Sequence, residues 1–177
     1  MVEIKKEMNF MIDLETLGTS TNCPVISIGA VFFDKKELKE EFYKVLDFGK
    51  QITEGRVVDW GTMKWWMFQD NKAKKVFKDI NADTKTALGE FALFCKMYKP
   101  KPWGNGATFD ITIIESLLKF YGVKVPWKFK NVRDYRTFCQ LFSKEIEREG
   151  TYHNALDDAK HQARNVIANL KDTEFNI

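Results

Sequence analysis

Residues 10–15 read Phe-Met-Ile-Asp-Leu-Glu, an apolar run that leads directly into two carboxylates. The run predicts a short buried strand, and strand alternation places Asp13 and Glu15 on one face of it and Leu14 on the other. Neighbouring carboxylates repel each other, and a hard divalent cation such as Mg²⁺ or Mn²⁺ relieves that repulsion. A strand end with two solvated acids is the alternative, and a bare Asp-x-Glu motif does not decide between the two.

Hydrophobic patterning around this stretch predicts an α/β fold. Strands are expected at residues 10–12, 25–33, 38–46, 103–104 and 129–132. Amphipathic helices are expected at residues 84–98, 108–121 and 154–170, with short helical pieces between 60 and 80 and a further helix ending at residue 142. Strands that come first and then alternate with helices predict a five-stranded mixed sheet flanked by helices, with three antiparallel strands followed by two parallel ones.

The composition is that of a globular protein with one domain over residues 1–177. It is 44% hydrophobic and 30% charged, with a net charge of +3, which only weakly suggests a polyanionic partner. Its three cysteines are far apart, so neither a zinc knuckle nor a disulfide framework is expected. No apolar stretch approaches the roughly 20 residues of a membrane span. We therefore expect no membrane partner and a cytoplasmic location.

A third acid lies at the end of the segment Trp103–Asp110, which reads Trp-Gly-Asn-Gly-Ala-Thr-Phe-Asp. Thr108 is expected to cap the following helix, which would place Asp110 in its first turn. A carboxylate there serves either a metal site or only the positive end of the helix macrodipole. The segment alone leaves both interpretations open.

The fourth acid and a histidine occur together in residues 153–159, His-Asn-Ala-Leu-Asp-Asp-Ala. Asn154 is expected to cap the last helix, with Asp157 answering it as in a capping box. Asp158 then projects from the first turn, and His153 lies just outside the helix. Histidine can accept a proton near neutral pH, which hydrolysis requires. An ordinary surface histidine is the alternative.

Taken together and in this order, the motifs resemble the DEDDh branch of the DnaQ-like exonuclease superfamily. The segments MIDLETLGT, SIGAVFFD, GNGATFD and HNALDDA are most similar to the phage exonuclease A (DexA-like) branch, a relative of ribonuclease T and oligoribonuclease. The resemblance spans about residues 8 to 170. It implies a ribonuclease H-like fold and a 3′–5′ exonuclease that releases nucleoside 5′-monophosphates from single-stranded DNA or RNA. It also allows a homodimer, and it implies that the cytoplasm in question is that of a bacterial cell or a phage-infected host.

The resemblance further implies a role for each motif residue. Asp13, Glu15 and Asp158 would hold the first of two Mg²⁺ or Mn²⁺ ions. Asp13 would bridge to the second ion, whose site Asp110 would complete. His153 would act as general base for the attacking water.

Contacts to the terminal nucleotide are expected from residues around these motifs. They are Leu14, Thr16, Leu17, Gly18, Trp65, Trp66, Asn105 and Phe109. Trp65 and Trp66 are adjacent in a helical segment, so one is expected to pack inward while the other is available to stack on a base. The alternative is that both tryptophans pack in the core. Two basic runs, at residues 72–78 and 124–136, either follow phosphates or form solvated faces.

Two other functions fit parts of the sequence. A ribonuclease H-like endonuclease also uses clustered acids, but the late pair of His153 and Asp158 argues against it. A non-catalytic nucleic-acid-binding module would not need every carboxylate and the histidine. The sequence leaves DNA and RNA both open as substrates.

Overall fold

A computed structural model describes residues 6–142 and 146–171, and it contains a five-stranded sheet in the order β3-β2-β1-β4-β5. The strands are β1 (Glu7–Thr16), β2 (Val25–Phe33), β3 (Leu38–Val45), β4 (Lys99–Gly104) and β5 (Arg133–Asp134). β1, β2 and β3 pair antiparallel, whereas β4 pairs parallel with both β1 and β5. The predicted mixed sheet is therefore confirmed.

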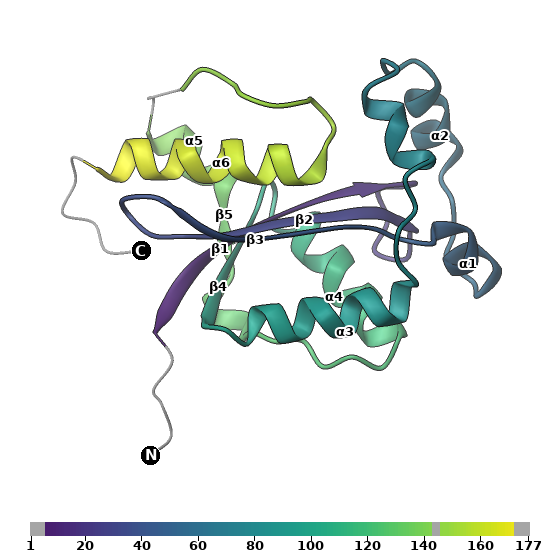
Figure 1. Ribbon diagram of the computed structural model, residues 1–177, viewed down its shortest axis with the longest axis horizontal. Helices are drawn as coiled ribbons and strands as arrows, with labels where there is room; N and C mark the ends of the chain where they lie inside the picture. Colours follow the sequence, from purple (N-terminus) through teal and green to yellow (C-terminus); the bar gives the residue numbers. More distant parts are fainter. Residues whose placement is uncertain (1–5, 143–145, 172–177) are drawn as a thin grey trace.

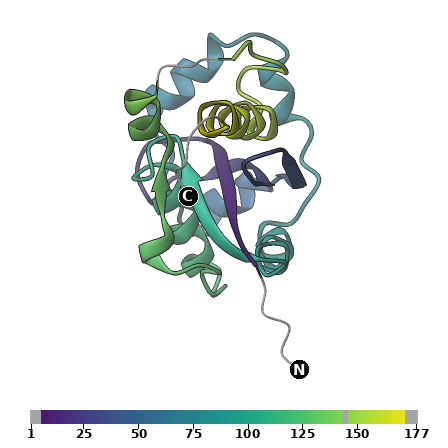
Figure 2. The same ribbon diagram turned by 90° about the vertical axis from the view of Figure 1, so that its left-hand side faces the viewer.

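Helices cover both faces of this sheet. They are α1 (Phe48–Thr53), α2 (Trp60–Met67), α3 (Thr84–Cys95), α4 (Asp110–Phe120), α5 (Tyr135–Leu141) and α6 (Ala155–Leu170), with short 3-10 helices η1 (Ala73–Phe77) and η2 (Phe129–Asn131). α3 and α4 lie on one side, and α5 and α6 lie on the other (Figure 1; Figure 2). α1 was not predicted from the sequence.

Alternation along β1 sorts its side chains between the two helical layers. Phe10 and Ile12 are buried in the core beneath α3 and α4, whereas Met11 packs in the core beneath α5 and α6. Asp13 and Glu15 follow Met11 at intervals of two, so they share its face. The strand thus presents both carboxylates to the layer that contains α6.

Gly29 allows α6 to lie directly on the sheet. A Cβ atom at Gly29 would fall 2.1 Å from the carbonyl carbon of Ala155, the first residue of α6. Gly29 is also the cross-strand partner of Asp13. Because Gly29 has no side chain, the N-terminus of α6 can contact β2 directly, beside Asp13 on β1.

The predicted fifth strand at residues 129–132 is wrong. Those residues form η2 and its end, and β5 follows at Arg133–Asp134. Phe129 is 88% exposed, so its apolar character does not mark a core position. Within the described part of the chain, β5 pairs with Trp103 and Gly104, the last two residues of β4.

β4 begins at Lys99, four residues earlier than predicted, and runs through Pro100 and Pro102. Lys99 donates its backbone N–H to Lys6 on the β1 side. Alternation points the ring nitrogens of the two prolines toward the opposite edge, where β5 has not begun. Proline is tolerated there because no ladder hydrogen bond is lost.

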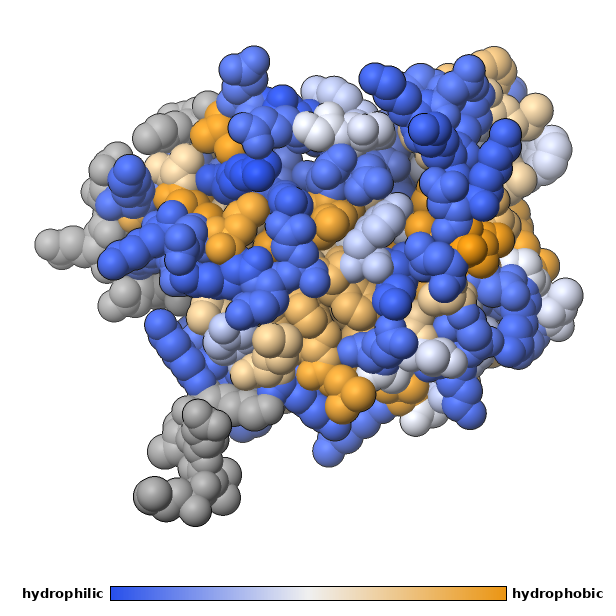
Figure 3. All heavy atoms as spheres, viewed as in Figure 1, coloured by the Kyte–Doolittle hydropathy of each residue, from blue (hydrophilic) through white to orange (hydrophobic). Residues whose placement is uncertain are grey.

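The helices of residues 6–142 and 146–171 include none that is long and apolar enough to cross a membrane. Hydrophilic side chains cover most of the face seen in Figure 3, with smaller apolar patches between them.

Candidate active site

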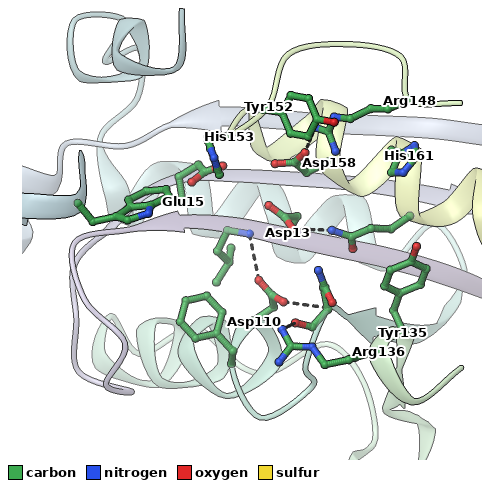
Figure 4. A pocket seen from close by; sticks show the side chains of 15 residues that line it. Asp13, Glu15, Asp110, Tyr135, Arg136, Arg148, Tyr152, His153, Asp158 and His161 are labelled. Atoms are coloured by element: carbon green, nitrogen blue, oxygen red, sulfur yellow. Dashed lines mark hydrogen bonds and ion pairs between the residues drawn. The ribbon is translucent and has the colours of Figure 1, made fainter. Parts of the chain in front are cut away.

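A cavity of about 740 Å³ opens at the carboxyl ends of β1 and β4 (Figure 4). Its lining residues are Asp13, Leu14, Glu15, Trp65, Asn105, Phe109, Asp110, Tyr135, Arg136, Arg148, Tyr152, His153, Asp158, His161 and Gln162. The four acids and the histidine singled out from the sequence all belong to this set. Residues as distant as positions 13 and 162 therefore share one cavity.

Asp13 lies near the end of β1 and is partly buried. Its Oδ1 accepts a hydrogen bond of 2.8 Å from Nε2 of Gln162 on α6. Burial raises the pKa of Asp13 well above its ordinary value, and the negative charges of Asp110, Glu15 and Asp158 raise it further. This carboxyl therefore ionises readily only when a positive charge is nearby.

Glu15 lies two residues further along β1 and is 7% exposed. Burial raises its pKa to about 8, and the charges of Asp158 and Asp110 act in the same direction, while Arg148 opposes them. Figure 4 shows the carboxylates of Asp13, Glu15 and Asp158 turned toward a common space from β1 and α6. The two strand acids are thus crowded by like charges in a poorly solvated position.

Asp110 enters from the opposite layer, and its surroundings differ from the prediction. α4 begins at Asp110 itself, so Thr108 is not the capping residue; the cap position is Phe109, which makes no side-chain bond. The Asp110 carboxylate accepts from the backbone N–H of Leu14 at 3.2 Å and of Asn105 at 3.0 Å. The pairing of β1 with β4 ends at Met11, so no carbonyl group of β4 accepts the N–H of Leu14. The Asp110 carboxylate accepts this N–H instead. Burial raises the pKa of Asp110 to about 7, although these N–H groups lower it.

The start of α6 positions Asp158. Asn154 caps the helix as predicted, because its side chain accepts from the backbone N–H groups of Leu156 and Asp157, each at 3.1 Å. The predicted capping-box role of Asp157 is wrong. Its carboxylate instead accepts from the N–H of Thr151 at 2.8 Å. It therefore fixes the segment that precedes the helix rather than the cap residue itself.

His153 connects this segment to the acids. It has a φ of 59°, in the left-handed region that non-glycine residues rarely adopt. Its ring meets Trp65 edge-on, with 4.8 Å between ring centroids. One ring nitrogen of His153 and one carboxylate oxygen each of Glu15 and Asp158 lie within 4.8 Å of one another. Such a group of oxygen and imidazole donors can hold a divalent metal ion.

Arg148 compensates part of the negative charge and was missed in the sequence. Its Nη2 donates to Oδ1 of Asp158 and also reaches the carbonyl oxygen of Thr151. The guanidinium lies 3.9 Å from the centroid of the Tyr152 ring. No periodic or motif signal distinguishes this arginine from the charged residues around it, so only the packing reveals it.

Other lining residues had weak signals in the sequence. Gln162 lies four residues after Asp158, and that spacing alone predicts that both lie on one face of α6. Arg136 donates to the carbonyl oxygen of Asn105 at 3.1 Å. Asp134 caps α5 and also accepts from the N–H of Ala107 at 2.5 Å. Residues 133–137 thus hold the loop that leads to α4.

The residues expected to contact substrate lie in three places. Leu14, Asn105, Phe109 and Trp65 line the main cavity. Thr16, Gly18 and Trp66 line an adjoining groove of about 430 Å³, together with residues such as Trp65. Leu17 is 2% exposed and packs in an apolar cluster. Its contact with a base stays a prediction.

The two tryptophans face different ways, as predicted. Trp66 is 2% exposed, and its Nε1 donates to the carbonyl oxygen of Thr16 at 2.9 Å. Trp65 is 43% exposed at the wall of the cavity. Trp66 therefore supports the end of β1, whereas Trp65 offers an aromatic surface to a bound molecule.

Comparisons with known proteins agree with this arrangement. A family model described as "3'-5' exoribonuclease Rv2179c-like domain" matches residues 8–170. The exodeoxyribonuclease of Enterobacteria phage T4 is 27% identical, over 73% of this chain and 69% of the phage protein. The resemblance inferred from the sequence is therefore confirmed.

Solved structures share the fold at low sequence identity. The nuclease domain of 3'hExo, a DEDDh family member bound to rAMP, aligns with a TM-score of 0.62 and 14% identity, over 93% of this chain and 92% of that one. Exonuclease I of E. coli, in complex with a 5cy-dT13 oligonucleotide, aligns with a TM-score of 0.60 and 12% identity, over 94% of this chain and 40% of that one.

Proposed function

Because this chain belongs to the 3'-5' exoribonuclease Rv2179c-like family and is a DEDDh-type 3′–5′ exonuclease, we propose that it releases nucleoside 5′-monophosphates from single-stranded nucleic acid with two divalent ions. The observation that carries the proposal is that one carboxylate oxygen each of Glu15 and Asp158 and one ring nitrogen of His153 lie within 4.8 Å of one another, so the carboxylates could hold an ion while the imidazole accepts a proton from water beside it. Asp13 and Asp110 line the same cavity.

The residues present fit Mg²⁺ or Mn²⁺. Burial raises the pKa of Asp13, Glu15 and Asp110, and like charges raise that of the first two further, so the site favours whatever brings positive charge into it. Asp13, Glu15 and Asp158 would hold one ion, and Asp13 and Asp110 the other. Divalent ions bound there would lower the pKa of water and offset the charge of the departing 3′ oxygen.

The chain's own residues would position the substrate and move the proton. His153 would accept the proton of the attacking water, since its ring lies beside Glu15 and Asp158 at the cavity wall. Gln162 orients the carboxylate of Asp13 by its hydrogen bond. Trp65 would stack on a base of the bound strand, a contact worth about 1–3 kcal/mol.

Digestion of a 5′-labelled single-stranded oligonucleotide tests the proposal. We expect a ladder that shortens from the 3′ end in Mg²⁺, mononucleotides as the second product, and no products in EDTA. Asp13→Ala should abolish the ladder. Asp79→Ala, which removes an exposed carboxylate outside the cavity, should leave it unchanged.

Other outcomes would contradict the proposal in distinguishable ways. Internal cuts would indicate the ribonuclease H-like endonuclease, and tight binding without cleavage would indicate the non-catalytic module. Matched DNA and RNA oligonucleotides would decide the preferred sugar, since the family description names RNA and the phage relative is named for DNA. A homodimer stays a prediction, which light scattering would test.

A further inference from the structure

A second cavity, of about 530 Å³, lies at the opposite end of the sheet from the active site. Its lining includes the first residues of β1 and β4, Glu7 and Lys99, whereas the active site lies at the carboxyl ends of those strands. Five lysines line it, namely Lys96, Lys99, Lys124, Lys128 and Lys130. Its one carboxylate, Glu7, pairs with Lys101 at 3.1 Å. The cavity is therefore strongly positive.

The segment that lines this cavity also carries an exposed aromatic residue. Phe129 is 88% exposed and lies between Lys128 and Lys130 in the sequence. A phenylalanine gains nothing from such exposure in the free protein. Cationic side chains interleaved with an exposed ring are what proteins use to bind single-stranded nucleic acid, since the cations contact phosphates and the ring stacks on a base.

The chain that leaves this cavity leads to the active site. After η2 it forms β5, which runs parallel to β4, and then enters α5. Figure 2 shows β5 at the outer edge of the sheet, with α5 beyond it on the α6 side. Arg133 lies in β5, and Arg136 lines the active-site cavity. Positive residues thus continue along the edge from one cavity to the other.

Within the described residues, four cationic side chains on this edge have no anionic partner and can therefore pair with the phosphates of a ligand. Lys128, Lys130, Arg133 and Arg136 form no ion pair with any residue in the described ranges 6–142 and 146–171. Among the described residues, the guanidinium groups of Arg133 and Arg136 donate to neutral backbone carbonyl oxygens.

We propose that this edge, residues 128–136 with the lysine cavity, binds the 5′ part of a single-stranded nucleic acid whose 3′ end occupies the active site. The proposal rests on the proposed function for the position of the 3′ end. The six residues of β4 span about 17 Å at the rise of a strand. A dinucleotide is too short to reach both cavities, whereas a 12-nucleotide strand is long enough.

Charge reversal at Lys128 and Lys130 tests the proposal. In Lys128→Glu/Lys130→Glu we expect kcat/KM for a 12-nucleotide strand to fall roughly tenfold or more at low salt, because two phosphate contacts are lost. The value for a dinucleotide should stay within about twofold of the parent, because it does not reach these lysines. Lys36→Glu/Lys85→Glu, with the same change of charge away from this edge, should behave as the parent.

Binding measured without catalysis separates this proposal from the proposed function. Fluorescence anisotropy of a labelled 12-nucleotide strand in EDTA should show weaker binding for the double variant and a salt slope lower by roughly 1.4, because two phosphate contacts at about 0.7 each are lost. Phe129→Ser should weaken binding by roughly tenfold through lost stacking. Equal affinity of parent and variants would overturn the proposal even if the parent hydrolysed nothing. Equal losses of kcat/KM for the dinucleotide and the longer strand would overturn it as well.

Discussion

Replacing Glu15 by glutamine should stabilise the metal-free protein, and the gain should grow with pH. Burial and the charges of Asp158 and Asp110 raise the pKa of Glu15 from 4.5 to about 8 in the folded chain. Between these two values the folded chain holds a proton that the unfolded chain has lost. The free energy of unfolding therefore falls as pH rises through this window. The contribution of the Glu15 carboxyl to stability is complete only below pH 4.5. Glutamine has the same shape and does not titrate.

The magnitude follows from the width of that window. Each pH unit between the two pKa values is worth about 1.4 kcal/mol. From pH 4.5 to 8, Glu15 would lower stability by on the order of 4 kcal/mol relative to Glu15→Gln. Because Glu15 is 7% exposed, little solvent reaches its carboxyl group to reduce this cost. Water that enters around the ionised group would reduce the difference, so about 4 kcal/mol is an upper value.

Urea unfolding in EDTA at pH 5, 6.5 and 8 measures this effect. The difference between Glu15→Gln and the parent should widen steadily with pH, and Mg²⁺ should then stabilise the parent more than the variant. Glu147→Gln, at an exposed position, is the matched control and should follow the parent. A difference that stays constant across the three pH values would refute the reasoning.

Three further substitutions test individual contacts. His153→Ala should lower turnover about 10²–10⁴-fold, and calorimetry should show little change in Mn²⁺ affinity. A variant that turns over as fast as the parent at neutral pH would rule out His153 as the general base. Arg148→Gln should raise Mn²⁺ affinity several-fold, because no guanidinium then pairs with Oδ1 of Asp158. That ion pair is worth on the order of 1 kcal/mol. Weaker Mn²⁺ binding by the variant would contradict this prediction. Gly29→Ala should lower stability by about 3 kcal/mol in thermal or urea unfolding, because its Cβ would lie 2.1 Å from the carbonyl carbon of Ala155. A melting temperature equal to that of the parent would show that α6 can move away.

Local rules account for what the sequence determined by itself. Asp13 and Glu15 share a face because strand side chains alternate, and this holds whatever the strand packs against. Asn154 caps α6 because a short polar side chain can accept the first free N–H groups of any helix. The order of β1, β2 and β3 and of the helices α3, α4 and α6 likewise follows from periodicity in consecutive residues. Each of these features depends only on neighbours in the chain.

The tertiary structure decided how these pieces meet. Asp110 accepts the N–H of Leu14, 96 positions away, because β1 and β4 separate before that point. Arg148 reaches Asp158 because the segment before α6 folds back over the cavity, and β5 is placed by its pairing with the end of β4 rather than by its own apolar residues. No periodic pattern encodes such contacts, since they arise when separate elements pack and exclude water together. The sequence thus specified which chemical groups the protein carries, and the packing of α6 on Gly29 and of Asp110 against Leu14 brought those groups into one cavity.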